Sequence, residues 1–426
     1  MLQIIGIGHI ISQGFPGKNK KRIWQNVKSA LYSGKNNPWS LLDTSRRVCA
    51  RSGRKALFHS GAGAGVRNNR IRRGRDNILY THVSWVDMMK KSIGSTLFFS
   101  DNIYIAGRYS IAGRNEGNGP LGEYFDRLIP NALWGEDSFE KCERKLFTSA
   151  VSSAIADADK KLDDIDMLFG GDLLNQIISA GYSARDLGIP FLGIYGACST
   201  YAEGLLFSSV MVDAGFADST VCAASSHFAA SERQFRFPLE LGTPKTPSSQ
   251  NTVTGAGAAV VSKIRPDRPS PTITCATVGR VVDPGVTDAN NMGAAMAPAA
   301  VETILTHFEN TGKSPKDYDA IITGDLGNFG SDIFRDFAKR AGCDMMAKHY
   351  DCGNMIFKGA KDEYCGGSGC ACGAVVMNAY FLKKLVAGEY KRILFAATGA
   401  LLSKTIVMQK DSIPSISHAV EIERSK

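Results

Sequence analysis

Cys198 stands in a run of small residues from Gly196 to Thr200 (GACST) that comes directly before an apolar helical stretch. A thiol in the first turn of a helix meets the positive end of the helix dipole and unpaired amide hydrogens. We expect a lowered thiol pKa there, which makes the thiolate a nucleophile, and the same donors can hold a carboxylate or an oxyanion. Thr200 and Glu203 fit a capping box for this helix. The alternative is a small apolar cysteine in a tight turn.

A second group of polar side chains follows the strand-like run STVCAA. Ser226 and His227 come directly after this strand, and Arg233 lies on the segment beyond it. Strand ends in α/β sheets gather ligand-binding groups, so His227 can act as a base near Cys198 and Arg233 can bind an anion with two hydrogen bonds. The alternatives are a hydrogen-bonded loop histidine and an arginine that is solvated or paired within the fold.

Two aspartates each follow a strand-like run and a glycine. They are Asp172 and Asp325, and we expect both carboxylates at strand ends that face the interface between the two halves of the chain. A buried carboxylate can cap a helix, pair with a basic group, or act as an acid or base, and helix capping is the commonest of these roles. Asn175 offers a further polar contact near Asp172.

The elements that must position these residues occur twice. DDIDMLFGGD at residues 163–172 and KDYDAIITGD at residues 316–325 repeat one strand pattern, and in each half a Gly-, Ala- and Cys-rich turn opens an apolar helix. A period this long exceeds that of solenoid repeats, which is a few tens of residues. The sequence therefore predicts a duplicated domain, with a site where its halves meet.

Helices and strands alternate along the chain, which favours α/β layers with largely parallel strands. Asp137 or Ser138 can cap the first helix. Residues 205–211 and 374–386 form two helices that are apolar nearly all round, so both need cover on every side. We expect a duplicated five-layer α-β-α-β-α sandwich with mixed sheets. Its N-terminal half spans 88–263 and its C-terminal half 271–423.

The basic character of the chain is confined to its beginning. The net charge is +9, yet residues 1–87 hold 16 lysines and arginines against three aspartates, which leaves 34 basic and 38 acidic residues elsewhere. This stretch lacks apolar periodicity, so we expect a disordered extension, or translated sequence upstream of a true start at Met88 and Met89. The alternative is an arm that binds nucleic acid or anionic membranes. We expect no nucleic-acid partner.

The spacing of the cysteines and the hydropathy of the chain indicate whether the protein binds metal and whether it spans a membrane. Cys365, Cys370 and Cys372 lack the paired spacing of a zinc site and have no histidine beside them, so we expect no metal and no other cofactor. No apolar run is expected to reach the 18 to 20 residues that span a bilayer, which predicts a soluble intracellular protein.

GACST, TVTGAGAAVV, DIDMLFGGD and RILFAATGALLS together resemble the thiolase superfamily. The resemblance implies the five-layer duplicated sandwich and a homodimer. Condensing enzymes of that superfamily use a cysteine together with a histidine and a second histidine or asparagine. Cys198 matches the cysteine, but Asp325 stands at the first partner position, and Gly and Ser of CGGSGC stand at the second.

From Met89 onward the chain more narrowly resembles the stage V sporulation protein AD family of spore-forming bacteria. GPLGEYFD, SSHFAASERQFRFP, NNMGAAMAPAAVETI and CGGSGCAC carry this resemblance. It implies a non-catalytic protein that binds dipicolinic acid, acting in its uptake during sporulation and its release at germination. Membrane proteins of the same channel system would be partners, and the place would be the cytoplasmic side of the spore inner membrane.

The resemblance also implies a ligand pocket around Cys198. The expected ligand-binding residues are Asp172, Asn175, Cys198, Ser226, His227 and Arg233. The alternative function is a thiolase-like acyltransferase or condensing enzyme in which Cys198 is the nucleophile.

Overall fold

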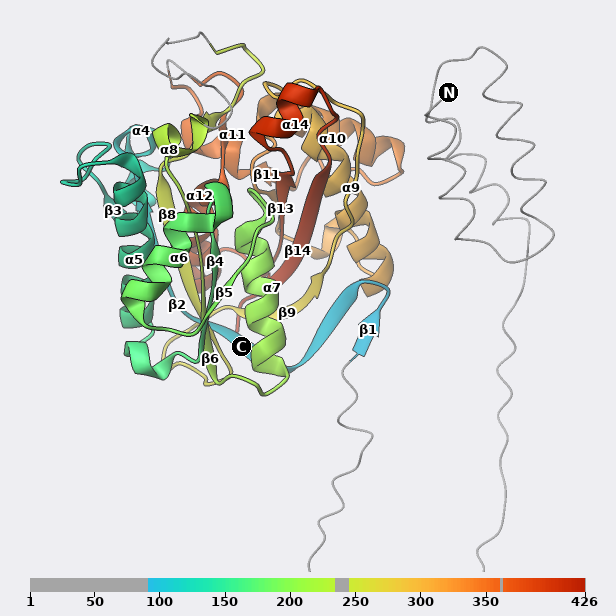
Figure 1. The fold of residues 1–426 in the computed structure, drawn as a ribbon. Helices are drawn as coiled ribbons and strands as arrows, with labels where there is room; N and C mark the ends of the chain where they lie inside the picture. Colours follow the sequence, from blue (N-terminus) through green and yellow to red (C-terminus); the bar gives the residue numbers. More distant parts are fainter. Residues whose placement is uncertain (1–90, 234–244, 361–362, 426) are drawn as a thin grey trace, which may run out of the picture. The chain divides into compact units, whose positions relative to one another are not determined.

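A computed structural model describes residues 91–425, apart from 234–244 and 361–362. The expectation for the basic extension at residues 1–87 lies outside the described residues. The described chain alternates helices and strands (Figure 1). Its strands are β1 (Lys91–Ile93), β2 (Thr96–Ala112), β3 (Arg127–Leu128), β4 (Met167–Gly171), β5 (Phe191–Gly193), β6 (Ser219–Ser226), β7 (Asn251–Thr252), β8 (Gly255–Ser262), β9 (Thr272–Thr277), β10 (Ala320–Thr323), β11 (His349–Asp351), β12 (Gly367–Ser368), β13 (Arg392–Ala400) and β14 (Ser415–Glu423).

The helices differ in length and type. The α-helices are α4 (Arg114–Gly117), α5 (Phe139–Asp157), α6 (Ile178–Leu187), α7 (Thr200–Asp213), α8 (Phe228–Glu232), α9 (Met292–Thr311), α10 (Gly327–Arg340), α11 (Cys352–Phe357), α12 (Cys370–Val376), α13 (Leu382–Ala387) and α14 (Lys404–Gln409). Short 3₁₀ turns are η2 (Gly122–Tyr124), η3 (Leu162–Asp164), η4 (Asn175–Ile177) and η6 (Pro315–Asp317), and η7 (Met377–Phe381) is a π-turn between α12 and α13.

The strand order of the main sheet shows that the fold is duplicated. From one edge to the other, the order is β11-β10-β13-β14-β9-β2-β8-β6-β4-β5. Reading outward from the centre, β2-β8-β6-β4-β5 and β9-β14-β13-β10-β11 have the same connectivity and the same pattern of parallel and antiparallel pairs. The two sets join where β2 pairs with β9, with a break in register between Phe98 and Ile103. This order confirms the expected duplicated α/β fold with mixed sheets. The boundaries 88–263 and 271–423 stay a prediction.

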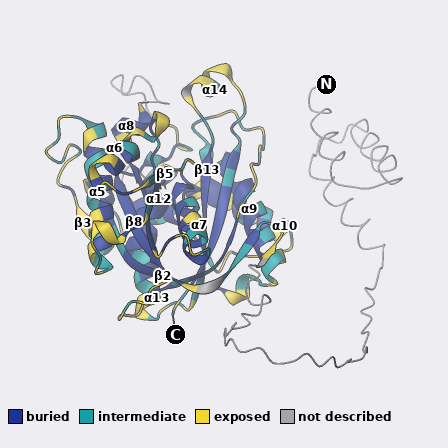
Figure 2. Ribbon diagram, turned by 60° about the horizontal axis from the view of Figure 1, so that its bottom comes forward, coloured by how far each residue is buried: buried dark blue, intermediate teal, exposed yellow. Residues whose placement is uncertain are grey.

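The helices separate into layers around the two sets of strands. Helices α5 and α6 cover the first set, α9 and α10 cover the second, and α7 and α12 lie between them (Figure 1). Burial is concentrated in the strands and in these middle helices (Figure 2). The middle helices are tied together where the Asn378 side chain in η7 donates to the Tyr201 hydroxyl at 2.8 Å and to the Ala374 carbonyl at 2.8 Å. Single π-turns of this kind occur mostly as bulges inside α-helices.

One helical run in the described part of the chain is longer and more apolar than the sequence analysis expected. Cys370–Ala387 has 18 residues with a mean hydropathy of 1.3, which meets the length and composition of a membrane span. In the fold, 72% of this run is buried inside the protein. Its apolar character matches its place in the middle layer, where sheets cover it on both sides.

The first long helix begins as its sequence predicts. Ser138 is the N-cap of α5, and its hydroxyl accepts a hydrogen bond from the Lys141 amide at 3.2 Å. Cys142, Leu146 and Ala150 recur at helical spacing and are fully buried. Capping and an apolar stripe therefore orient α5 against the outer face of the first set of strands.

Candidate functional site

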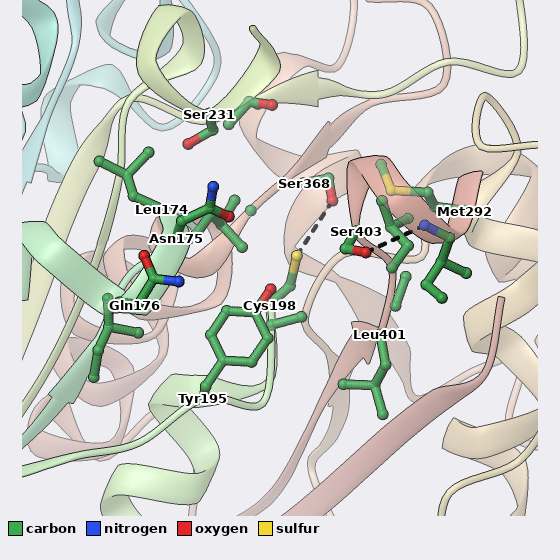
Figure 3. A pocket seen from close by; sticks show the side chains of 18 of the residues that line it. Leu174, Asn175, Gln176, Tyr195, Cys198, Ser231, Met292, Ser368, Leu401 and Ser403 are labelled. Carbon is green, nitrogen blue, oxygen red and sulfur yellow. Dashed lines mark hydrogen bonds between the residues drawn. The ribbon is translucent and has the colours of Figure 1, made fainter. Parts of the chain in front are cut away.

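A cavity of about 830 Å³ opens beside Cys198, where loops from both halves of the duplication converge (Figure 3). Segments after β4 and β5 form one wall, and the segment from the end of β13 into α14 forms the opposite wall. The lining residues are Leu173, Leu174, Asn175, Gln176, Ile177, Gly193, Ile194, Tyr195, Ala197, Cys198, Ser231, Arg233, Thr252, Met292, Ser368, Gly369, Ala400, Leu401, Leu402, Ser403 and Ile406. The cavity therefore combines apolar walls with hydroxyl, amide, thiol and guanidinium groups.

The turn that carries Cys198 is held in an unusual backbone conformation. Ala197 has a φ of 50°, in the left-handed region that non-glycine residues seldom adopt. The Thr200 hydroxyl closes the turn by donating to the Ala197 carbonyl at 2.6 Å and accepting from the Gly196 amide at 3.1 Å. The expected capping box is wrong, because Ser199 is the N-cap of α7 and no side chain caps it. The Thr200 hydroxyl instead orients the turn.

Two side chains from the second half of the chain meet the thiol. Cys198 Sγ lies 3.7 Å from Ser368 Oγ, and the Ser368 hydroxyl donates to Asp325 Oδ2 at 2.6 Å. Figure 3 shows the Cys198 sulfur pointing toward Ser368 across the cavity. Asp325 also accepts from the Thr398 hydroxyl at 2.9 Å. The residues at the two catalytic-partner positions of the resemblance thus form a hydrogen-bonded chain that leads to Cys198.

The electrostatic setting of Cys198 is the reverse of the one expected from its place before a helix. Burial raises the pKa of the Cys198 thiol well above its ordinary value, and the neighbouring Asp325 carboxylate raises it further. The Cys198 side chain has only 7% exposure, so water stabilises the thiolate little. The predicted lowering of the pKa is wrong, because desolvation and a nearby negative charge outweigh the helix dipole.

Three of the residues expected in the pocket line the cavity: Asn175, Cys198 and Arg233. Arg233 provides the charged side chain among the described lining residues. Its guanidinium lies 3.4 Å from the Glu140 carboxylate and above the ring of Phe139, and Arg233 Nε donates to a backbone carbonyl. Its side chain remains 42% exposed, so a ligand can still reach it.

Asp172 and Ser226 are outside the lining and hold the framework around it. The Asp172 carboxylate accepts from the Leu174 and Ala180 amides, both at 2.8 Å, and burial raises its pKa to about 6. This contact fixes the loop that carries Asn175. The Ser226 hydroxyl donates to the Val253 carbonyl at 2.6 Å and accepts from the Ala371 amide at 3.1 Å, which ties the two halves together.

His227 lies outside the lining of the cavity and is fully buried, and both of its ring nitrogens have backbone partners. Nδ1 accepts from the Ala229 amide at 3.2 Å, so Nε2 carries the hydrogen and donates to the Ala132 carbonyl at 2.8 Å. The ring stacks on Phe139 and on Phe228, and burial lowers its pKa. This geometry matches the alternative of a hydrogen-bonded loop histidine.

Several cavity residues were missed by the sequence analysis. Thr252, Ser403 and Ser231 stand within the quoted stretches TVTGAGAAVV, RILFAATGALLS and SSHFAASERQFRFP, but nothing in those stretches singles out these hydroxyl groups, so only the fold places them at the cavity. Ser368 lies within CGGSGC, a glycine-rich signal whose polar member could have been singled out. Glycine permits close backbone approach, which makes a lone hydroxyl within such a run a candidate contact.

A separate buried cluster has residue types that can bind metal. The ligand atoms of Cys275, His307 and Glu421 all lie within 4.8 Å of one another. The Glu421 carboxylate accepts from Lys313 Nζ at 2.6 and 2.8 Å and from the Tyr318 hydroxyl at 2.6 Å. A carboxylate held by an ammonium and a hydroxyl fits a buried ion pair with full hydrogen bonding, which has a structural role.

Comparisons with known proteins agree on one family and one fold. The family described as Stage V sporulation protein AD matches residues 94–423. The chain is 45% identical over 337 residues to Stage V sporulation protein AD of Bacillus subtilis (strain 168), which covers 79% of this chain and 99% of that protein. Two crystal structures of OleA variants from Xanthomonas campestris are 17% identical, with TM-scores of 0.51 and 0.50. They cover 78% of this chain and 99% and 100% of theirs. They share the thiolase-like fold.

Proposed function

This chain belongs to the stage V sporulation protein AD family, and we propose that it binds dipicolinic acid in the cavity beside Cys198. The observation that carries the proposal is the cavity itself, in which hydrogen-bond donors lie between apolar walls. Dipicolinic acid is a planar pyridine ring with two carboxyl groups. Leu401 and Tyr195 offer surfaces for such a ring, Arg233 and Asn175 offer donors for its carboxylates, and Ser368 adds a hydroxyl group to the lining.

The state of Cys198 supports binding without catalysis. A nucleophilic cysteine needs a thiolate, but burial and Asp325 keep this thiol protonated. In the condensing enzymes that the sequence resembles, imidazole and amide groups assist the cysteine, whereas Asp325 and Ser368 stand at those positions here. Histidine does not occur among the described residues that line the cavity. These features favour a binding protein over the alternative of an acyltransferase.

We infer a role in moving dipicolinate into the developing spore and releasing it at germination, together with membrane proteins of the same channel system. Family membership supports this role and a peripheral position on the cytoplasmic side of the spore inner membrane. A homodimer is supported by the sheet edge at β5, where Leu192 is 52% exposed, and by Phe216, which is 72% exposed. Unpaired edges and exposed apolar side chains are common at protein interfaces.

Calorimetric titration of the full chain with dipicolinic acid tests the proposal. We expect saturable binding that is weakened about tenfold or more by Arg233→Gln, since a hydrogen bond to a charged group contributes about 1.5–3 kcal/mol. Arg280→Gln is the matched control, because Arg280 is 81% exposed and lies outside the cavity lining. Absence of saturable binding by the folded wild-type protein would overturn the proposal.

A further inference from the structure

Asp325 lies next to the cavity and is separated from it by the hydroxyl group of Ser368. It follows β10 and is only 1% exposed. Its Oδ2 accepts from the Ser368 hydroxyl at 2.6 Å and from the Gly369 amide at 3.4 Å, and its Oδ1 accepts from the Thr398 hydroxyl at 2.9 Å. Ser368 itself lines the cavity. A ligand that touches Ser368 is therefore a close neighbour of the Asp325 carboxylate.

Among the described residues, the groups that face Asp325 provide no positive charge. In the part of the chain that the structure describes, the titratable groups that interact with it are one carboxylate and several thiols: Asp351, Cys198, Cys352, Cys370 and Cys372. Hydrogen bonds from hydroxyl and amide groups favour the ionised form, but burial is the largest effect and raises the pKa of Asp325. A further negative charge nearby would raise it more.

A carboxylate of the ligand that binds against Ser368 supplies this further negative charge near Asp325. Two carboxylates in one poorly hydrated site do not both remain ionised, and one proton is shared between them. The Ser368 hydroxyl links the protonation state of Asp325 to the ligand, because this hydroxyl has a single hydrogen and rotates freely. When Asp325 is ionised, that hydrogen is committed to Asp325. When Asp325 is protonated, the acid donates to Ser368 Oγ, and the Ser368 hydrogen turns to the ligand.

We propose that Asp325 and Ser368 are the recognition group for one carboxyl of the ligand, and that each binding event takes up one proton at Asp325. This inference rests on the proposed function and identifies a proton as a second ligand of the same site. The proton comes from solvent and stays on an Asp325 oxygen, and no covalent bond of the ligand forms or breaks. The site thereby selects ligands that place a carboxylate against Ser368, and its affinity for them rises as the pH falls.

Calorimetric titration with dipicolinic acid tests the inference in several buffers of equal pH and different ionisation enthalpy. The dependence of the measured heat on the buffer gives the number of protons taken up, which we expect to approach one per ligand. The pKa of Asp325 is higher in the complex than in the free protein. Between those two pKa values, affinity is expected to fall by up to about tenfold for each pH unit of increase.

Asp325→Asn separates proton uptake from binding, because the amide donates permanently to Ser368 Oγ and leaves the serine hydrogen free for the ligand. We expect this variant to bind with an affinity that does not change with pH and to take up no proton, whereas Ser368→Ala loses affinity at every pH. Glu116→Gln is the control. Glu116 is also buried, with a pKa raised to about 7 by burial, but it lies outside the cavity lining, so the variant keeps the proton uptake.

The outcomes distinguish this inference from the proposed function. Saturable binding of dipicolinic acid by the wild-type protein without proton uptake overturns the inference and leaves the proposed function standing. The same holds if Asp325→Asn folds, binds and still takes up a full proton. If the folded wild-type protein shows no saturable binding at any pH, both are overturned.

Discussion

Substituting alanine for Gly399 should disturb the fold and the cavity together. Gly399 in β13 faces the carbonyl oxygen of Gly196, so the second half of the chain touches the turn that carries Cys198 at this point. An added Cβ would lie well inside the 3.0 Å separation that real Cβ atoms keep from other atoms, and the atom that obstructs it is the backbone carbonyl oxygen of Gly196. Either β13 or the Cys198 turn must therefore move.

The expected cost follows from two opposing effects. Overpacking of a close contact destabilises a protein by about 1–3 kcal/mol. The loss of glycine flexibility in the unfolded chain offsets about 0.4–1 kcal/mol of this. We expect a net decrease of about 1–2 kcal/mol in the free energy of unfolding. Because Ala400 and Ala197 both line the cavity, the displacement should also weaken binding of dipicolinic acid.

Urea unfolding measures the change, and a second glycine provides the control. Gly181 lies within α6 with open space where a Cβ would point, so Gly181→Ala should stabilise the protein by about 0.5–1 kcal/mol through helix propensity. A Gly399→Ala protein as stable as wild type, with unchanged ligand affinity, would refute the reasoning that a backbone contact between the halves holds the Cys198 turn.

The other predictions concern a cap, a buried ion pair and the thiol. Ser138→Ala should lower the free energy of unfolding by about 1 kcal/mol in urea titrations, because the Lys141 amide loses its cap. Burial opposes ionisation of Glu421, yet hydrogen bonds from neighbours that include Lys313 keep its pKa well below 4.5. The ionised Glu421 therefore stabilises the folded protein above pH 4.5, and this stabilisation is lost as the pH falls. Glu421→Gln should cost about 3–5 kcal/mol at pH 7 and flatten the acid branch of stability measured between pH 3 and pH 7. Cys198 should alkylate slowly with iodoacetamide at pH 7 and form no adduct with acyl thioesters by mass spectrometry, because its pKa is raised; rapid acylation would favour the acyltransferase alternative.

Much of the fold could be read from the chain because the signals are local. A strand that ends in Gly-Asp occurs at Asp172 and again at Asp325, and the helix after Ser138 has apolar residues at helical spacing. Periodicity and capping depend on residues close together in the sequence, so they indicate elements and their duplication. The small-residue turn also identified Cys198 as a cavity residue.

The chemistry of the site depended on contacts that no local pattern contains. Asp325 and Ser368 are far from Cys198 in the sequence, and only the packing of the two halves brings them to the thiol and reverses the expected direction of its pKa shift. The same packing commits both nitrogens of His227 to backbone groups and leaves Arg233 at the cavity. Sequence alone determined the elements and their repetition, because these arise from neighbouring residues. Tertiary structure decided ionisation and accessibility, because these depend on every group that surrounds a side chain in space.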